Sequence, residues 1–164
     1  MTRIGLISDT HSFLDDAVFT HFGQCDEIWH AGDFGNAAVA EKLAAFKALK
    51  GVYGNIDGYD IRSHYPELLR WSCEGVEVMM CHIGGYPGKY TPIVKNEMKK
   101  HPPKLFISGH SHILKIIYDK QYDCLHINPG AAGKEGWHKM RTLVTFDING
   151  SNIENCNIIE LGKR

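Results

Sequence analysis

Seven polar side chains of metal-ligand type follow short apolar segments of this 164-residue chain. They are Asp9, His11, Asp33, Asn55, His82, His110 and His112. Together they form a mixed nitrogen and oxygen donor set without a thiolate. Such a set suits Mn²⁺, iron, Zn²⁺, Ni²⁺ or Co²⁺, and it argues against a structural zinc site built on cysteine. Seven protein groups are too many for one open catalytic ion, so they indicate two divalent ions that share a carboxylate.

The apolar segments before these side chains predict the strands that position them. In the first half, strands are predicted at 4–8, 27–30 and 49–53, and helices around 18–22 and at 36–47, with Asn36 as N-cap. This βαβαβ alternation predicts parallel strands covered by helices. Ligands gather at the carboxyl ends of strands in such sheets, so we expect the polar side chains to converge there.

Strands predominate in the second half of the chain. The predicted elements are a hairpin of 68–73 and 76–81 around Glu74-Gly75, a helix from Pro92 to about Lys100 capped by Thr91, and a strand at 105–108. Further strands are predicted at 114–118, 124–127, 143–148 and 153–159. We expect these last four to complete an antiparallel set, with Asn149-Gly150 as a tight hairpin turn.

Each motif also has a simpler interpretation. Asp9 could cap the next helix, Gly32-Asp33 and Gly54-Asn55 could be ordinary turns, and His82 could be a histidine at a strand end. The pair His110 and His112 is more informative, because alternate residues of an extended chain point to one side. The order of all five motifs after successive strands favours a metal site.

Taken in order, the motifs resemble those of the calcineurin-like metallophosphoesterase superfamily. They are Ser8-Asp9-Thr10-His11, Gly32-Asp33, Gly54-Asn55, His82 and Gly109-His110-Ser111-His112. The short length and Asn128-Pro129-Gly130 resemble its small YfcE-like phosphodiesterase branch. The resemblance covers nearly the whole chain and implies a four-layer α/β/β/α sandwich of two mixed sheets flanked by helices.

The resemblance also implies a division of the ligands between two ions. One ion would be held by Asp9, His11, Asp33 and His112, and the other by Asp33, Asn55, His82 and His110, with Asp33 as the bridge. Asp33, Asn55, His82 and His110 are then the expected catalytic residues. We expect a phosphoesterase, most simply a Mn²⁺-dependent phosphodiesterase, that hydrolyses its ester by in-line attack of a metal-bridging hydroxide.

Three positions depart from the family pattern. Many members have a histidine directly after the asparagine, where this chain has Ile56, which cannot protonate a leaving group. The residues after His82 are Ile83-Gly84-Gly85, where the family often has Gly-His. Ala131 replaces a serine commonly found after Asn-Pro-Gly. The first departure predicts a preference for esters with activated leaving groups.

Residues beyond the ligand set are candidates for supporting roles. Asp57 and His30 could orient ligands, with a backbone hydrogen bond as the alternative for His30. Gly84-Gly85 could present backbone N–H groups to phosphate. Trp137 and His138 could belong to the pocket rim or to a subunit contact, and the sequence leaves both open.

Two other function classes stay open. This fold also serves as an interaction scaffold with a vestigial metal site, as in the retromer subunit that resembles these enzymes, although here no ligand is missing. A metallonuclease would need a basic, aromatic groove, which a net charge of −1 does not favour. We therefore expect a small phosphate ester as the substrate, rather than nucleic acid. A homo-oligomer is compatible with the resemblance alone.

Length and composition indicate the number of domains, the absence of a membrane-spanning helix and the state of the cysteines. The length and 43% hydrophobic content predict one globular domain spanning residues 1–164. No apolar run approaches the roughly 20 residues of a membrane-spanning helix. The five cysteines have neither zinc-knuckle nor redox spacing, so we expect idle or buried thiols in a reducing cytoplasm.

Overall fold

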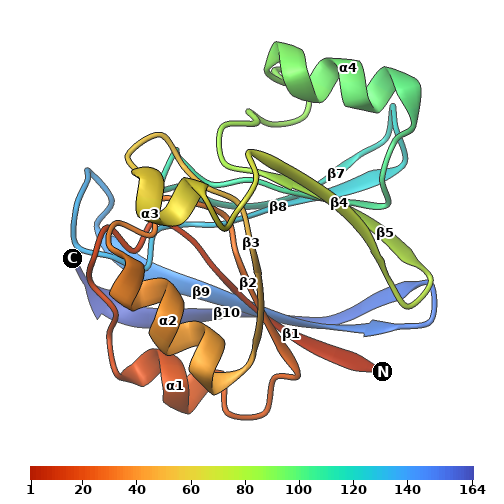
Figure 1. Cartoon of the computed structure of the whole chain (residues 1–164). Coiled ribbons are helices and arrows are strands. Elements are labelled where there is room, and N and C mark those ends of the chain that lie inside the picture. Colours follow the sequence, from red (N-terminus) through yellow and green to blue (C-terminus); the bar gives the residue numbers. More distant parts are fainter.

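The structure is a computed structural model that describes all residues 1–164 and contains two five-stranded sheets packed face to face (Figure 1). In chain order the elements are β1 (Thr2–Ile7), α1 (Ala17–His21), β2 (Glu27–His30), α2 (Ala37–Phe46), β3 (Ala48–Gly51), α3 (Tyr59–Arg62), β4 (Leu68–Cys73), β5 (Val76–Cys81), α4 (Pro92–Lys100), β6 (Leu105–Ile107), β7 (Leu114–Asp119), β8 (Cys124–Pro129), β9 (Met140–Asn149) and β10 (Asn152–Lys163). Helices α1 and α2 cover one outer face and α4 covers the other. The predicted four-layer α/β/β/α sandwich is confirmed.

The first sheet has the order β10-β9-β1-β2-β3, with β1, β2 and β3 parallel as predicted. The second has the order β4-β5-β6-β8-β7. The antiparallel pairings of the predicted set are confirmed for β7 with β8 and for β9 with β10, but the set is wrong in two respects. Its four strands divide between the two sheets, and β8 runs parallel to β6 while it pairs antiparallel with β7. The apolar pattern identifies a strand but does not show which neighbour it will pair with.

Three apolar clusters hold the four layers together. The central cluster lies between the sheets and includes Ile4 and Trp29 from the first and Met80 and Ile107 from the second. A second cluster packs α1 and α2 onto the first sheet, and a third packs α4 onto the second. Burial of apolar surface on both faces of each sheet fixes the strands, so loops at the strand ends are held on a rigid support.

The predicted bounds coincide with the structure for β2, β4, β5 and α4, and they differ by a few residues for the other predicted elements, while α3 was not predicted. The predicted cap of α2 is confirmed, since Asn36 Oδ1 accepts a hydrogen bond from Val39 N at 3.2 Å. Thr91 holds the predicted N-cap position of α4, but its side chain accepts no cap hydrogen bond, and its hydroxyl donates to the Ile83 carbonyl. The β9–β10 turn is Gly150-Ser151, one residue later than predicted, because Asn149 still pairs with Asn152.

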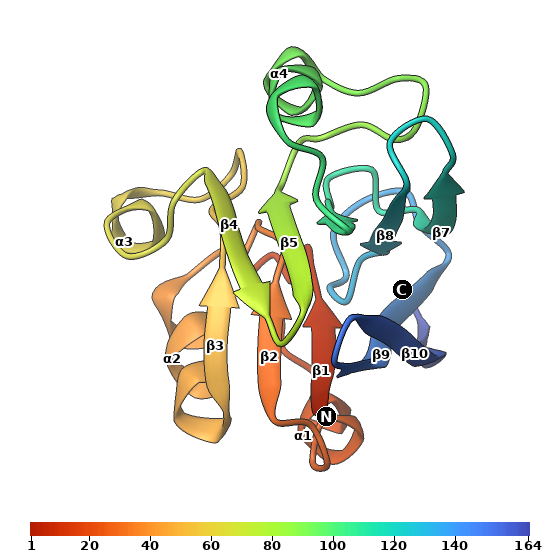
Figure 2. The same cartoon turned by 90° about the vertical axis from the view of Figure 1, so that its right-hand side faces the viewer.

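Strands from both sheets end at the same edge of the molecule. Figure 2 shows β1, β2, β3 and β5 running in one direction, toward the side where α3 and several loops lie. No helix in the structure combines the length and apolar character needed to cross a bilayer. The shared edge is where the candidate ligands lie.

Candidate metal centre

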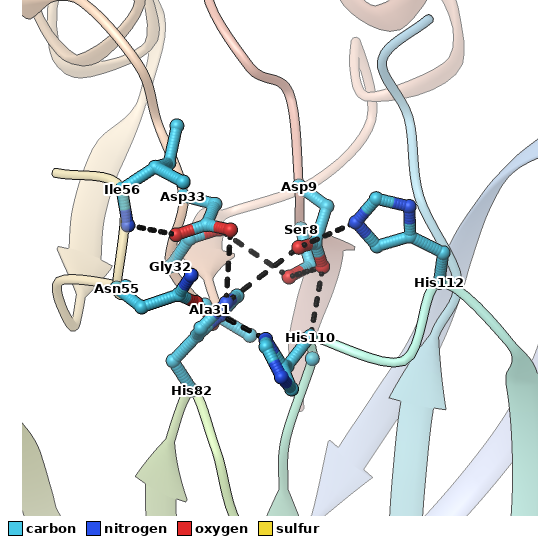
Figure 3. A network of polar contacts seen from close by, with 12 residues as sticks. Ser8, Asp9, Ala31, Gly32, Asp33, Asn55, Ile56, His82, His110 and His112 are labelled. Carbon is cyan, nitrogen blue, oxygen red and sulfur yellow. Dashed lines mark hydrogen bonds and ion pairs between the residues drawn. The ribbon is translucent and has the colours of Figure 1, made fainter. Parts of the chain in front are cut away.

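All seven candidate ligands lie in loops that follow strands ending at this edge. Asp9 and His11 follow β1, Asp33 follows β2, Asn55 follows β3, His82 follows β5, and His110 and His112 follow β6. Figure 3 shows most of them converging between the ends of the two sheets. The helix-cap alternative for Asp9 is wrong, because α1 begins only at Ala17, after Asp16.

The first group of side chains is Asp9, His11 and His112, whose donor atoms lie within 4.8 Å of one another. Asp9 Oδ1 is 3.1 Å from His112 Nε2 and 3.8 Å from His11 Nε2. The side chains of Asp9, His11 and His112 are 0%, 16% and 14% exposed, so the group is open to solvent only from the histidine side.

The second group is Asp33, His82 and His110. Asp33 Oδ2 is 3.1 Å from His82 Nε2, and Asn55 Oδ1 is 3.1 Å from His110 Nδ1. The same Asp33 oxygen is 3.2 Å from His11 Nε2 in the first group. Asp33 Oδ2 therefore lies close to a histidine of each group, which is the position that a bridging ligand requires, whereas Asp9 Oδ1 is farther from the second group, at 3.6 Å from His82 Nε2.

His110 and His112 contribute to different groups. The prediction that both rings point to one side of an extended chain is wrong, because β6 ends at Ile107 and both histidines have positive φ angles. The turn around Ser111 sends the two rings apart, so that a single short loop supplies both groups.

Hydrogen bonds orient the ligands so that one atom of each stays free. Asp9 Oδ2 accepts from Ser8 Oγ at 2.7 Å and from His110 N at 3.1 Å, which turns Oδ1 toward the histidines. His82 Nδ1 lies 2.7 Å from the Ala31 carbonyl oxygen, to which it must donate. The lone pair of neutral His82 is therefore on Nε2, facing Asp33.

Three buried polar atoms at the centre make no hydrogen bond of good geometry. They are Asp9 Oδ1, His11 Nε2 and His82 Nε2. Each lies 3.1–3.8 Å from a carboxylate oxygen or imidazole nitrogen of another candidate ligand, but none of these contacts is well directed for a hydrogen bond. Buried polar atoms without a partner are costly, and a cation that accepts their lone pairs would satisfy all three. The residues present therefore fit a divalent metal site.

The charges of the centre are strongly coupled. Burial opposes ionisation of Asp9, yet the contacts with His11 and His112 outweigh it and hold the pKa of this carboxyl well below its ordinary value. The pKa of Asp33 is lowered in the same way by His11 and His82. The carboxylates of Asp33 and Asp9 raise the pKa of His11 to about 9. A bound cation would take the place of these imidazole protons.

Asp57 is buried and supports the loops that carry Asp33 and Asn55. Its carboxylate accepts from Gly54 N at 2.8 Å, Gly35 N at 2.9 Å and Phe34 N at 3.2 Å. The expected supporting role of Asp57 thus has a structural basis, acting through backbone N–H groups rather than through the ligand side chains.

His30 lies deeper than predicted and contacts neither Asp33 nor Asn55. Its Nε2 is 3.0 Å from Thr10 Oγ1, and its Nδ1 accepts from Gly32 N at 3.1 Å. Burial lowers its pKa to about 3. The prediction of direct ligand orientation is wrong, and the alternative of a backbone hydrogen bond is correct.

Two supporting residues went unassigned in the sequence. Ser8 orients Asp9 through the hydrogen bond described above, and a serine at a strand end gives no signal of that role. Asn128 Nδ2 donates to Gly109 O at 3.0 Å and to Ser111 Oγ at 3.1 Å, which holds the loop between His110 and His112. The Asn-Pro-Gly segment was the available signal for this second residue.

The surroundings of the centre include the departures noted in the sequence. Ile56 is 46% exposed and its backbone N donates to Asp33 Oδ1, so it contributes a backbone group but no acid. Trp137 is fully exposed, while the His138 ring lies 5.1 Å from the His112 ring. Four of the five cysteines are buried, in line with the expected idle thiols, and Cys156 is exposed.

Known structures with the same fold include enzymes and other proteins. One reported as a novel archaeal phosphodiesterase superposes with a TM-score of 0.77 at 22% identity, covering 97% of this chain and 99% of that one. Vps29 from Entamoeba histolytica, complexed with Zn²⁺, gives a TM-score of 0.73 at 15% identity, with 96% and 98% covered. These likenesses establish the fold.

Sequence comparison establishes the family. The profile of the calcineurin-like phosphoesterase superfamily domain matches residues 2–151. A probable metallophosphoesterase from Methanothermobacter thermautotrophicus is 30% identical over 134 residues, which cover 78% of this chain and 76% of that protein. On the combined strength of the profile match and this relative, the chain belongs to the calcineurin-like phosphoesterase superfamily.

Proposed function

We propose that the protein is a phosphodiesterase that works with two divalent cations, most simply Mn²⁺, on a small phosphate ester. The observation that carries the proposal is the complete donor set around orphaned buried atoms, with Asp33 Oδ2 in contact with both ligand groups. A scaffold with a vestigial site would have no need to keep such costly groups together.

The assignment of ligands follows the two groups. Asp9, His11, Asp33 and His112 would hold one ion, and Asp33, Asn55, His82 and His110 the other. When bound, two such ions acidify a water nucleophile and offset the charge of the phosphoryl oxygens. The nitrogen and oxygen donors suit Mn²⁺, and they would also accept Zn²⁺, Ni²⁺, Co²⁺ or iron.

The protein groups around the ions have roles that follow from their contacts. Ser8 and the backbone N of His110 keep Asp9 Oδ1 turned inward, and the Ala31 carbonyl keeps the His82 lone pair on Nε2. Holding the ligands in advance lowers the reorganisation needed during attack in line with the leaving alkoxide. Ile56 offers that alkoxide no proton, so the leaving group must depart with its charge or take a proton from water.

The test is hydrolysis of bis(4-nitrophenyl) phosphate by protein stripped of metal and reloaded with Mn²⁺. We expect turnover only after loading, with two ions per chain by elemental analysis. Asp33→Asn should lose at least ~1,000-fold in kcat/KM, since it weakens both ion sites at once. Asp16→Asn is the matched control, because Asp16 is exposed and its side chain makes no cap hydrogen bond.

The alternatives predict different results. Absence of turnover with every divalent metal would favour the interaction scaffold, which shares this fold. Faster hydrolysis of oligonucleotides than of small diesters would favour the metallonuclease. Turnover of Asp33→Asn equal to that of Asp16→Asn would refute the proposed site.

A further inference from the structure

A cavity of about 190 Å³ opens beside the candidate metal centre, with His110 among its lining residues. One wall is the outer face of the second sheet, where Lys115 of β7 pairs with Asn128 of β8. His126 lies two residues before Asn128 on β8, so it shares that face. The opposite wall is the loop 83–91, which begins next to the ligand His82. Figure 1 shows this loop passing from β5 to α4 on the same side of the sheet.

The loop wall is held firmly in place. Thr91 N donates to the Gly84 carbonyl at 3.1 Å, and the Thr91 hydroxyl donates to the Ile83 carbonyl at 3.1 Å. A Cβ atom on Gly84 would lie 2.3 Å from the ring of Phe106, so the loop rests directly on the sheet. The cavity is therefore a built feature between two fixed walls.

Its lining has free hydrogen-bond donors and no carboxylate. None of the twelve lining residues is Asp or Glu. The Lys115 ammonium lies 4.3 Å from the centroid of the Tyr86 ring rather than against an acid. Ser111 Oγ accepts from Asn128 Nδ2 and Ile113 N, which leaves its own O–H free to donate.

His126 adds a buried nitrogen without a partner. The residue is 1% exposed, lines the cavity, and its Nδ1 makes no hydrogen bond. Burial, with help from the nearby Lys115 charge, lowers its pKa to about 4, although a hydrogen bond with the Phe106 backbone opposes the shift. The neutral ring therefore forms part of the cavity wall, and its buried Nδ1 is not accessible to a ligand.

We propose that this cavity is a subsite for a negatively charged substituent on the organic group of the substrate, with Lys115 and Ser111 as its donors. The proposal rests on the phosphodiesterase function and deepens it. A phosphate bound at the ligand groups beside His110 would place one of its ester groups at the mouth of the cavity. The small volume fits a short chain that ends in a carboxylate or a second phosphate, and it excludes a polymer.

The test uses two substrates that differ in charge but not in shape or leaving group. They are 3-carboxypropyl 4-nitrophenyl phosphate and 3-carbamoylpropyl 4-nitrophenyl phosphate, assayed with the Mn²⁺-loaded protein after subtraction of the uncatalysed rate. We expect the carboxylate substrate to have a KM about tenfold lower, the size of one charge-assisted hydrogen bond in a partly open site.

The variants identify the residues responsible. Lys115→Met keeps the aliphatic stem and should remove the tenfold preference by raising KM for the carboxylate substrate alone, with kcat unchanged. His126→Phe keeps an aromatic ring on Phe106 and should leave the preference in place, because His126 only forms the wall. Lys120→Met is the control, because Lys120 is exposed on the same hairpin and does not line the cavity.

A binding measurement separates this proposal from the proposed function. Calorimetry with 4-phosphonobutanoate and its terminal amide needs no turnover, and Lys115→Met should weaken binding of the diacid only. Equal KM values for the two substrates, or equal effects of Lys115→Met on both, would overturn the subsite while leaving the phosphodiesterase intact. If neither substrate is hydrolysed, the function fails. Calorimetry then decides the subsite, which is overturned by equal binding of the two phosphonates.

Discussion

Gly54→Ala tests whether the close approach of two loops sets the position of Asp33. A Cβ atom at residue 54 would lie 2.0 Å from Asp33 Oδ1 and 2.4 Å from Asp33 N. Rotation of the carboxylate could relieve the first contact, but the second is with backbone. The loops must therefore separate, and the Asp33 carboxylate must move with them.

The magnitude follows from the size of that movement. Contacts of 2.0–2.4 Å must lengthen to ordinary van der Waals separation, and a displacement of about 1 Å at a reacting centre costs on the order of 100-fold in rate. This loss equals about 2.7 kcal/mol in the activation free energy. We expect Gly54→Ala to lose about 100-fold in kcat/KM for bis(4-nitrophenyl) phosphate and to bind Mn²⁺ more weakly.

Gly58→Ala is the matched control four residues along. A Cβ there would meet only Asp60 Oδ1, at 3.5 Å, and φ is −93°. Thermal unfolding with and without Mn²⁺ shows whether each variant folds and how much the metal stabilises it. If Gly54→Ala fails to fold, Gly109→Ala gives a second version of the test, since its Cβ would lie 2.3 Å from Ser8 Oγ and 2.8 Å from Asp9 Oδ2. A rate for Gly54→Ala within twofold of Gly58→Ala would refute the reasoning.

Three further predictions concern other groups. Asp57→Asn should weaken Mn²⁺ binding about 10–100-fold, as measured by titration, because the carboxylate no longer holds the backbone N–H groups of the loops that carry Asp33 and Asn55. Unchanged affinity would show that these loops keep their positions without Asp57. Acid should destabilise the wild type more than His126→Phe. The pKa of His126 is about 4 in the folded protein against 6.5 unfolded, so the wild type loses stability as pH falls from 6.5 toward 4, by roughly 3 kcal/mol. Urea unfolding at pH 7.5 and 4.5 should therefore show a smaller change for the variant, and parallel changes would contradict the assignment. Because Ile56 supplies no acid, kcat for aryl phosphodiesters should fall steeply as the leaving-group pKa rises; a flat dependence would mean that another group donates a proton.

The sequence predicted elements whose signals are local. Asn36 before an amphipathic segment placed α2, and the Glu74-Gly75 turn between two apolar runs placed the β4–β5 hairpin with correct bounds. Both depend on residues within a few positions of one another. The pairing of β8 with β6 depends on which strands are already neighbours in space, and no short pattern reports it.

In the candidate site, too, local features could be predicted and contacts between distant segments could not. The types of the candidate ligands and their positions after strands were predicted from the sequence, because side-chain chemistry and strand ends are local properties. The supporting contacts were not. Asp57 accepts hydrogen bonds from Phe34 N and Gly35 N, in a loop that lies 23 and 22 residues away from it in sequence. For His30 the sequence left ligand orientation and a backbone hydrogen bond open, because strand-end position says nothing about depth, and its ring is completely buried.

Backbone strain at the ligands is a further property that residue types alone do not reveal. Five candidate ligands have positive φ angles: Asp9 (53°), His11 (46°), Asp33 (59°), His110 (72°) and His112 (62°). Each such residue costs roughly 1 kcal/mol or more, so together they cost an amount comparable with the net stability of a domain, about 5–15 kcal/mol. These loops have no shared turn sequence. What they have in common is that each carries a candidate ligand whose side chain reaches the same point between the sheets. Three apolar clusters offset a cost that is concentrated at this point, and that cost brings the candidate ligand side chains together.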